Sequence, residues 1–228
     1  MTGVNVLYPG IELYNKKKYD DSLAFFLALP PDSGADADEV AYYLGLCYAK
    51  LRRYEDALLY LEQVVTSGSK ISRVLQCRFI LAFIYTLSGR KRLAAFELDK
   101  LLESGYKLSS VYAAIAYIAW EEGKTDKCFE YYEKSLKLDP QNVTSMNGLG
   151  YVLACENKDL TKALSYCKKA VASAPESAAC LDSLGWVYYK LGIYTDAKKY
   201  LEMAEELDKE NELIAEHIKT LSLSGDSK

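Results

Sequence analysis

Three features of the sequence have residue types and spacings that could support chemistry. Residues 148–154 read Gly-Leu-Gly-Tyr-Val-Leu-Ala, the outline of a glycine-rich turn that holds the pyrophosphate of a dinucleotide. His217 is the only histidine, and therefore the only imidazole that could act as a general base or bind a metal. Four carboxylates that could bind a cation lie close together in the sequence: Asp32, Asp36, Asp38 and Glu39.

None of the three features fits its chemistry. A dinucleotide turn follows a strand, whereas residues 148–154 lie inside a predicted helix, where small residues serve packing. The four carboxylates lack the ligand order of a calcium loop, so we expect a solvated acidic loop. We expect His217, in the last predicted helix, to be a solvated surface group. The sequence therefore predicts a protein that is not an enzyme and has no metal site and no cofactor.

Composition and charge exclude further classes of protein. The 228 residues carry a net charge of −4, whereas a protein that binds nucleic-acid phosphates needs a basic surface. The two basic clusters, Lys16–Lys18 and Arg90–Arg92, fall in predicted turns between helices. No apolar run reaches the roughly 18 residues that a membrane-spanning helix needs. We therefore expect no nucleic-acid partner and no membrane span.

The six cysteines and the first residues bear on location. The cysteines are scattered, and no two of them form a Cys-x-x-Cys pair. We therefore expect small buried hydrophobic side chains rather than disulfides or a zinc site. The first ten residues lack the basic and apolar regions of a signal peptide. These observations predict a cytoplasmic location.

The elements that would position any site are helices that repeat along the chain. Apolar residues recur with a period of 3.6 residues, and no segment alternates with period two. One order of residues occurs twice, at 44–61 and at 184–201. In both places Leu-Gly is followed three residues later by Tyr, nine residues further on by Ala and then, four residues on, by Leu.

This order resembles the tetratricopeptide repeat, a unit of about 34 residues that forms a pair of helices. The frame gives five consecutive units, which are 38–71, 75–108, 109–142, 143–177 and 178–211. The resemblance implies an all-α fold, a right-handed superhelical solenoid of antiparallel helix pairs. In this frame Gly45, Gly150 and Gly185 lie where two helices approach closely. Pro140 and Pro175 end the second helices of their units.

The flanking segments complete the array. Residues 1–37 read as a degenerate N-terminal repeat, whose first helix begins at Pro9, followed by the acidic loop. Residues 212–228 read as a capping helix over Glu212–Ser222 and a polar tail from Ser224. Caps of this kind protect the stacking face that a terminal repeat would otherwise expose.

The resemblance also implies which side chains face a concave groove, because the first helix of each unit lines it. We predict a partner-binding surface that is largely aromatic and includes both tryptophans. Its residues are Tyr42, Tyr43, Leu46, Phe79, Phe83, Tyr117, Trp120, Asn147, Tyr151, Asp182, Trp186 and Tyr189. A clamp for a terminal carboxylate is not expected, since Lys50 and Lys190 lie far apart in the array.

These predictions favour a non-catalytic scaffold or adaptor that binds an apolar or amphipathic peptide or helix of another protein. Aromatic surfaces suit this role because rigid rings bury much area at a small cost in entropy. Two alternatives stay open: a homo-oligomer that uses the same face or the ends of the solenoid, and a groove for a lipid or other small apolar ligand. Aromatic residues at helical spacing can also belong to the core, so part of this surface could be covered.

Overall fold

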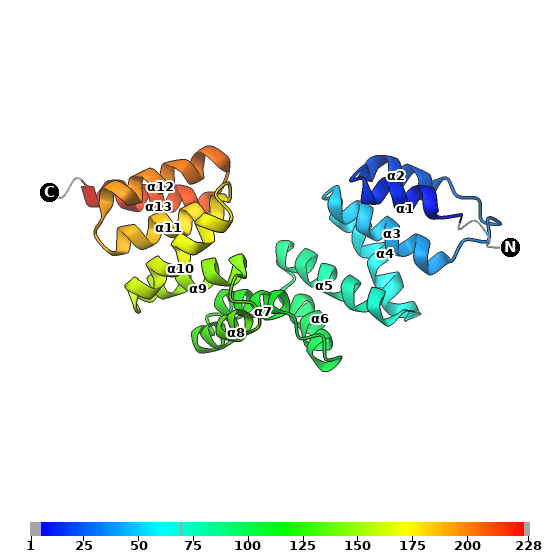
Figure 1. The fold of residues 1–228 in the computed structure, drawn as a ribbon, viewed down its shortest axis with the longest axis horizontal. Helices are drawn as coiled ribbons and strands as arrows, with labels where there is room; N and C mark the ends of the chain where they lie inside the picture. Colours follow the sequence, from blue (N-terminus) through cyan, green and yellow to red (C-terminus); the bar gives the residue numbers. More distant parts are fainter. Residues whose placement is uncertain (1–5, 69, 226–228) are drawn as a thin grey trace. The chain divides into compact units, whose positions relative to one another are not determined.

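The computed structural model describes residues 6–68 and 70–225, and within them every regular element is an α-helix (Figure 1). The chain divides into two compact units, Met1–Lys107 and Leu108–Lys228, here called the N-terminal unit and the C-terminal unit. The boundary falls between the second and third predicted repeats. In the ranges described, no helix is long and apolar enough to cross a membrane.

The described residues of the N-terminal unit form six helices, packed as successive hairpins. They are α1 (Tyr8–Asn15), α2 (Tyr19–Leu27), α3 (Ala37–Lys50), α4 (Tyr54–Ser67), α5 (Ile71–Leu87) and α6 (Lys91–Glu103). Two of these bounds refine the sequence prediction. Helix α1 begins at Tyr8, with Pro9 in its first turn. Helix α5 begins at Ile71, so residues 72–74, which the repeat frame leaves between units, are helical.

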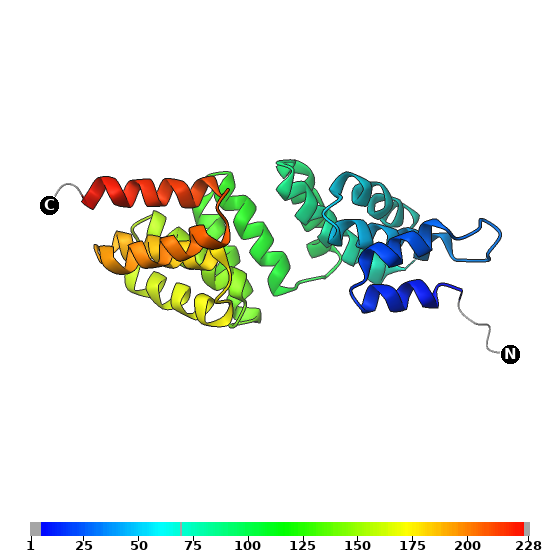
Figure 2. The ribbon, with the colours of Figure 1, turned by 90° about the horizontal axis from the view of Figure 1, so that it is seen from above.

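Up to Gly225, where its described part ends, the C-terminal unit consists of three hairpins and one further helix. They are α7 (Ser109–Glu121), α8 (Thr125–Leu138), α9 (Val143–Cys155), α10 (Leu160–Ser173), α11 (Ala178–Lys190), α12 (Tyr194–Leu207) and α13 (Glu212–Gly225). Helix α13 runs alongside α12 (Figure 2). It extends past the predicted end at Ser222, so Ser224 is helical rather than part of a tail. Residues 226–228 of the predicted tail lie outside the described residues.

Polar side chains fix where several helices begin. Asp36 Oδ1 accepts the backbone N–H of Asp38 at 3.1 Å and caps α3. The side chains of Asn142 and Ser177 cap α9 and α11 in the same way. Each cap satisfies one backbone donor that a helix start leaves without an intrahelical partner. Helices α3, α9 and α11 are the first helices of their repeat units, and residues next to their starts determine where they begin.

Small residues allow the helices of each hairpin to approach closely, as the repeat frame predicts. A methyl group on Gly45 would lie 2.7 Å from a Leu61 methyl carbon, and one on Gly185 would lie 2.8 Å from Leu201. A methyl group on Gly150 would lie 2.5 Å from the Cys167 sulfur. These distances are shorter than any ordinary van der Waals contact, so glycine is required at all three positions.

Candidate functional site

The predicted binding residues are divided between the two units. Tyr42, Tyr43 and Leu46 lie on α3 and Phe79 and Phe83 on α5, while the other seven lie on α7, α9 and α11. The prediction is wrong for two of the twelve. Leu46 is 4% exposed and Asp182 is 3% exposed, because neighbouring helices cover both side chains. Neither can contact a partner while the unit stays folded.

In the N-terminal unit, the tyrosines of α3 pack among the unit's own aromatic residues. The Tyr43 ring lies parallel to that of Phe26, with centroids 5.3 Å apart, and edge-on to that of Tyr14 at 5.8 Å. The Tyr42 hydroxyl donates to Gln76 Oε1 at 2.7 Å. Burial raises the pKa of Tyr42 to about 12. These two rings therefore join helices within the unit.

Part of the acidic segment also has a structural role. Arg73 of α5 forms ion pairs with Glu39 at 2.5 Å and with Asp36 at 3.7 Å. Its guanidinium carbon lies 5.4 Å from the centre of the Tyr42 ring. The sequence predicted a solvated loop, which fits Asp36 but not Glu39, whose side chain is 18% exposed. Across the part of the chain that the structure describes, no group of three or more possible ligand residues could hold a metal ion.

Apolar side chains remain exposed along one side of α5. Phe83 is 56% exposed and Leu87 is 55% exposed, and Phe79 is half-buried one turn before Phe83. The three residues are spaced four apart, so they share one face of the helix. We call Phe79, Phe83 and Leu87 the α5 patch. This spacing makes the patch a contiguous apolar strip rather than three isolated side chains.

In the C-terminal unit, α7 carries the corresponding exposed aromatic residue. Tyr117 is 45% exposed, and Trp120, three residues later, is half-buried against the core of the unit. Asn147 of α9 instead serves the fold, since its Nδ2 donates to the backbone oxygen of Ala179 at 3.4 Å. Tyr117 and Trp120 are therefore the predicted residues of this unit that remain accessible and take no part in the contacts between α11 and α13.

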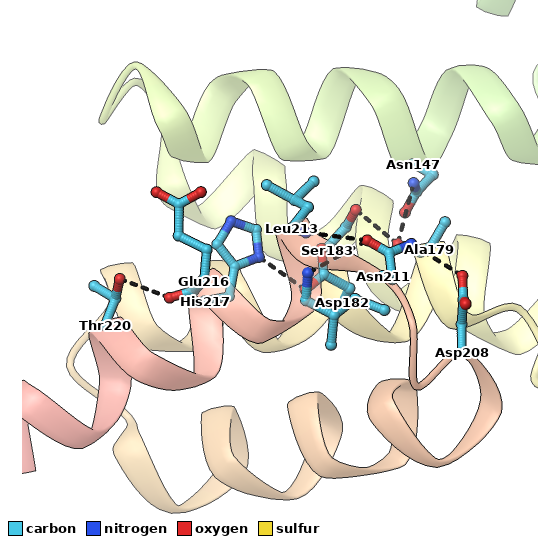
Figure 3. A network of polar contacts seen from close by, with 11 residues as sticks. Asn147, Ala179, Asp182, Ser183, Asp208, Asn211, Leu213, Glu216, His217 and Thr220 are labelled. Atoms are coloured by element: carbon cyan, nitrogen blue, oxygen red, sulfur yellow. Dashed lines mark hydrogen bonds and ion pairs between the residues drawn. The ribbon is translucent and has the colours of Figure 1, made fainter. Parts of the chain in front are cut away.

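The prediction for His217 is wrong, because the side chain is 4% exposed and lies in the interior. Its Nδ1 lies 2.8 Å from Asp182 Oδ1, and this contact joins α13 to α11 (Figure 3). Helix α13 packs on α11 and α12, which turns the histidine toward α11. If the repeat frame is extended by one more unit, that unit begins at residue 212 and His217 is its sixth residue. A side chain at the sixth position faces the first helix of the preceding unit, which here is α11. That signal was present in the sequence.

The imidazole of His217 also covers the second tryptophan. Its ring lies parallel to the Trp186 ring, with centroids 4.1 Å apart, and the Tyr189 ring stacks on Trp186 at 4.9 Å. The Tyr189 hydroxyl is 3.0 Å from Ser224 Oγ of α13. Trp186 and Tyr189 are therefore engaged by other side chains of the unit, so they offer a partner only part of their surface.

Tyr151 and Cys155 of α9 complete this cluster. Burial is the main cause that raises the pKa of the Tyr151 hydroxyl, and the nearby Cys155 thiol raises it further. Burial raises the pKa of the Cys155 thiol. Both pKa values are raised, so at neutral pH both groups are protonated. The cluster joins α9 to α11.

The glycine-rich segment and most of the cysteines have the structural roles that were predicted for them, and one basic cluster does not. Residues 148–154 lie within α9, and a methyl group on Gly148 would lie 2.2 Å from the Tyr132 hydroxyl oxygen, so this glycine serves packing. Five of the six cysteines are buried, as predicted, and Cys155 is partly exposed. In Arg90–Arg92, the second and third residues begin α6 instead of lying in the turn.

Comparisons with known sequences agree with the repeat frame. Three sequence models of the tetratricopeptide repeat match residues 39–67, 109–142 and 141–210. The chain is 34% identical over 87 residues to the TPR repeat-containing protein PA4667 of Pseudomonas aeruginosa. The aligned region covers 36% of this chain and 15% of that protein. It is 24% identical over 187 residues to the human protein O-mannosyl-transferase TMTC1, and this alignment covers 80% of this chain and 21% of that protein. The chain therefore spans only a small part of either relative.

Solved structures share the fold at low identity. The Cut9–Hcn1 hetero-tetramer of the APC/C superposes with a TM-score of 0.76 and 12% identity, covering 94% of this chain and 42% of that chain. YrrB, described as a TPR protein with an unusual peptide-binding site, superposes with a TM-score of 0.53 and 16% identity. That superposition covers 81% of this chain and 92% of the YrrB chain. These likenesses concern the arrangement of helices alone.

Proposed function

The chain belongs to the tetratricopeptide repeat family, and on that basis we propose that it is a non-catalytic adaptor that binds an apolar or amphipathic segment of another protein. One observation carries the proposal. Among the twelve predicted binding residues, the exposed aromatic ones are Phe83 of the α5 patch and Tyr117 of α7, both at positions where the first helix of a unit presents side chains to a partner. Contiguous exposed apolar side chains are typical of interaction sites.

The similar folds support an adaptor role. YrrB is described as having a peptide-binding site, and Cut9 as part of a hetero-tetramer. A non-catalytic role agrees with the state of the one imidazole. His217 lies between Asp182 and Trp186 and is 4% exposed, so a substrate could not reach it in the folded unit.

The energetics favour a partner that contacts more than one surface. Full burial of a Phe or Leu side chain contributes about 1.5–3 kcal/mol. Phe83 and Leu87 are already about half-covered, so burying the α5 patch would contribute about 3 kcal/mol. Association itself costs at least about 4 kcal/mol. The patch alone is therefore too small, and we propose Tyr117 and Trp120 as a second, separate contact surface on the C-terminal unit.

A peptide selection tests the proposal. Amphipathic helical peptides are selected on the full chain by display, and their Kd values are measured by fluorescence polarisation. Phe83→Ala should weaken binding about tenfold, or about 1.4 kcal/mol. Phe96→Ala is the matched control, because Phe96 is 51% exposed but lies on α6, the second helix of the same hairpin. We expect the control to bind like wild type, with the same helical circular dichroism.

Two results would contradict the proposal: a selection that yields no peptide, or equal affinities for Phe83→Ala and Phe96→Ala. Tyr117→Ala tests the surface on the C-terminal unit separately. It should weaken the selected peptides whose affinity Phe83→Ala leaves unchanged. Unchanged affinity of Tyr117→Ala for every selected peptide would show that Tyr117 contacts none of them.

A further inference from the structure

In the hairpins of the described residues, the second residue after each first helix has a left-handed backbone. These residues are Lys17, Arg52, Gly89, Gly123, Asn157 and Gly192. Glycine and asparagine tolerate a positive φ, whereas other L-residues rarely adopt one. The hairpins of α1 and α3 depart from this preference, because they carry Lys17 at φ 61° and Arg52 at φ 59°.

These two cations are held at a cost in stability. In the left-handed region the Cβ atom comes close to a backbone carbonyl oxygen, a contact that glycine avoids. The side chains do not recover this cost within the unit. Both are exposed, and neither forms a hydrogen bond or an ion pair with any residue in 6–68 or 70–225. Unfavourable backbone conformations of this kind are typical of functional positions.

Arg52 lies near one end of the α5 patch. Helices α3 and α5 are the first helices of consecutive hairpins and contact each other. Lys50 is the last residue of α3, and Leu87 is the last residue of α5. Arg90 Nη2 lies 2.9 Å from Glu55 Oε1, which ties the turn after α5 to the start of α4. The turn after α3 therefore lies beside the turn that follows Leu87.

Three cations at this end have no partner among the described residues. Lys50, Arg52 and Arg92 are exposed and form no ion pair there, and we call them the basic edge. The acidic residues that begin α4 do not neutralise them. Glu55 and Asp56 each form an ion pair with another arginine instead. The end of the α5 patch formed by Leu87 therefore adjoins uncompensated positive charge.

The other end of the α5 patch has the opposite charge balance. Arg73, near the start of α5, forms ion pairs with Glu39 and Asp36 of the α3 start. Asp38 and Lys70 are the remaining charged residues at these two helix starts. Three anions and two cations leave this end slightly negative. The apolar strip therefore runs from a weakly acidic end to a basic one.

We infer that the partner segment that binds the α5 patch has an acidic end, and that this end pairs with the basic edge. The inference rests on the adaptor function proposed above and specifies the chemistry of the partner. Apolar side chains of the segment cover Phe83 and Leu87, and carboxylates beyond them meet the three cations. A nucleic acid or an anionic membrane fits less well, because negative charge along the whole strip would be repelled by Glu39 and Asp36.

A charge scan of one peptide tests the inference. The tightest selected peptide that Phe83→Ala weakens is synthesised with three Glu or three Gln residues at one end, and in a second pair at the other end. Kd values are measured by fluorescence polarisation at about 50 and about 500 mM NaCl. At one end only, the Glu peptide should bind about tenfold more tightly than its Gln counterpart in low salt, since each exposed ion pair contributes modestly. High salt should remove most of this difference.

Arg52→Gly separates partner binding from stability. It should weaken binding of the tight Glu peptide about threefold and leave its Gln counterpart unchanged. Its thermal midpoint should nevertheless rise by about 1–2 °C, because glycine relieves the left-handed backbone. Asn157→Gly is the matched control, since it makes the same change at the corresponding position of the C-terminal unit. It should leave every peptide affinity unchanged.

The outcomes distinguish this inference from the proposed function. Equal binding of Glu and Gln peptides at both ends overturns the inference, while the adaptor function stands if Phe83→Ala still weakens all four. Equal losses of the Glu and Gln peptides in Arg52→Gly also overturn it. A selection without any peptide that depends on Phe83 contradicts the adaptor function itself and removes the site on which the inference rests.

Other polyanions are tested in the same way. The probes are a single-stranded DNA of about 20 nucleotides and vesicles of phosphatidylserine and phosphatidylcholine. Both should bind wild type more weakly than the tight Glu peptide does. Tighter binding of either probe, reduced by Arg52→Gly, would overturn the assignment of the basic edge to an acidic protein segment.

Discussion

Replacing His217 by alanine should destabilise the C-terminal unit strongly. The side chain is 4% exposed, and its Nδ1 lies 2.8 Å from Asp182 Oδ1, which is itself in a side chain 3% exposed. Removing one partner of a buried pair leaves the other without compensation, at a cost of about 3–5 kcal/mol. Loss of the stacked ring on Trp186 adds about 0.5–1.5 kcal/mol. We expect a total loss of about 3.5–6.5 kcal/mol.

Urea unfolding provides the measurement. The free energy of unfolding is obtained from far-UV circular dichroism and from tryptophan fluorescence in a Trp120→Phe background, where Trp186 alone reports on the neighbourhood of His217. Glu216→Ala is the matched control, because Glu216 precedes His217 on the same helix but is exposed. We expect it to change the free energy of unfolding by no more than about 0.5 kcal/mol.

A second variant separates the polar pair from packing. Replacing Asp182 and His217 together by leucine removes both buried polar groups, and it should restore much of the stability lost in His217→Ala. The reasoning is refuted if His217→Ala unfolds within about 0.5 kcal/mol of wild type, as the control does. That result would mean that the histidine is solvated, as the sequence alone suggested.

Three further predictions concern packing and titration. Gly150→Ala should destabilise the chain by about 1–2 kcal/mol in thermal unfolding, because overlap with the Cys167 sulfur outweighs the gain of about 1 kcal/mol in helix propensity. Cys155 should react first with a maleimide at neutral pH, as judged by mass spectrometry, because the other five cysteines are buried; a faster reaction at Cys77 would contradict the burial. Stability should fall from about pH 9 toward pH 12, measured as the thermal midpoint. Burial raises the pKa of Cys77 and of Tyr42 to about 12 from 9.0 and 10.0, so unfolding releases their protons at high pH, whereas a constant midpoint would refute the argument.

Much of the fold could be predicted because the repeat encodes it locally. Glycine at 45, 150 and 185 marks close helix contacts, and side-chain caps such as Asn142 mark helix starts. Both signals depend on a few neighbouring residues and on one helix partner. The exceptions lie where the repeat is irregular, as at residues 72–74, where the frame has a gap but the helix continues.

The candidate site was predicted less completely. The frame selects the helix positions that face inward, but it does not tell how much of each side chain the neighbouring helices cover. Leu46 and Asp182 were selected and are buried, while Phe83 was selected and is exposed. Exposure depends on the size of side chains on helices that are about 35 residues away in sequence, which a single unit does not contain.

The sequence by itself determined the class of the protein, the positions of its helix pairs and the absence of a second imidazole, because each follows from local periodicity or composition. Only the tertiary structure decided which aromatic residues are accessible. Helix α13 covers Trp186 and Tyr189 through His217 and Ser224, so these rings contribute to the stability of their unit. The physical reason is that burial belongs to the packed assembly of helices, and a contact such as His217 to Asp182 exists only once α13 has docked.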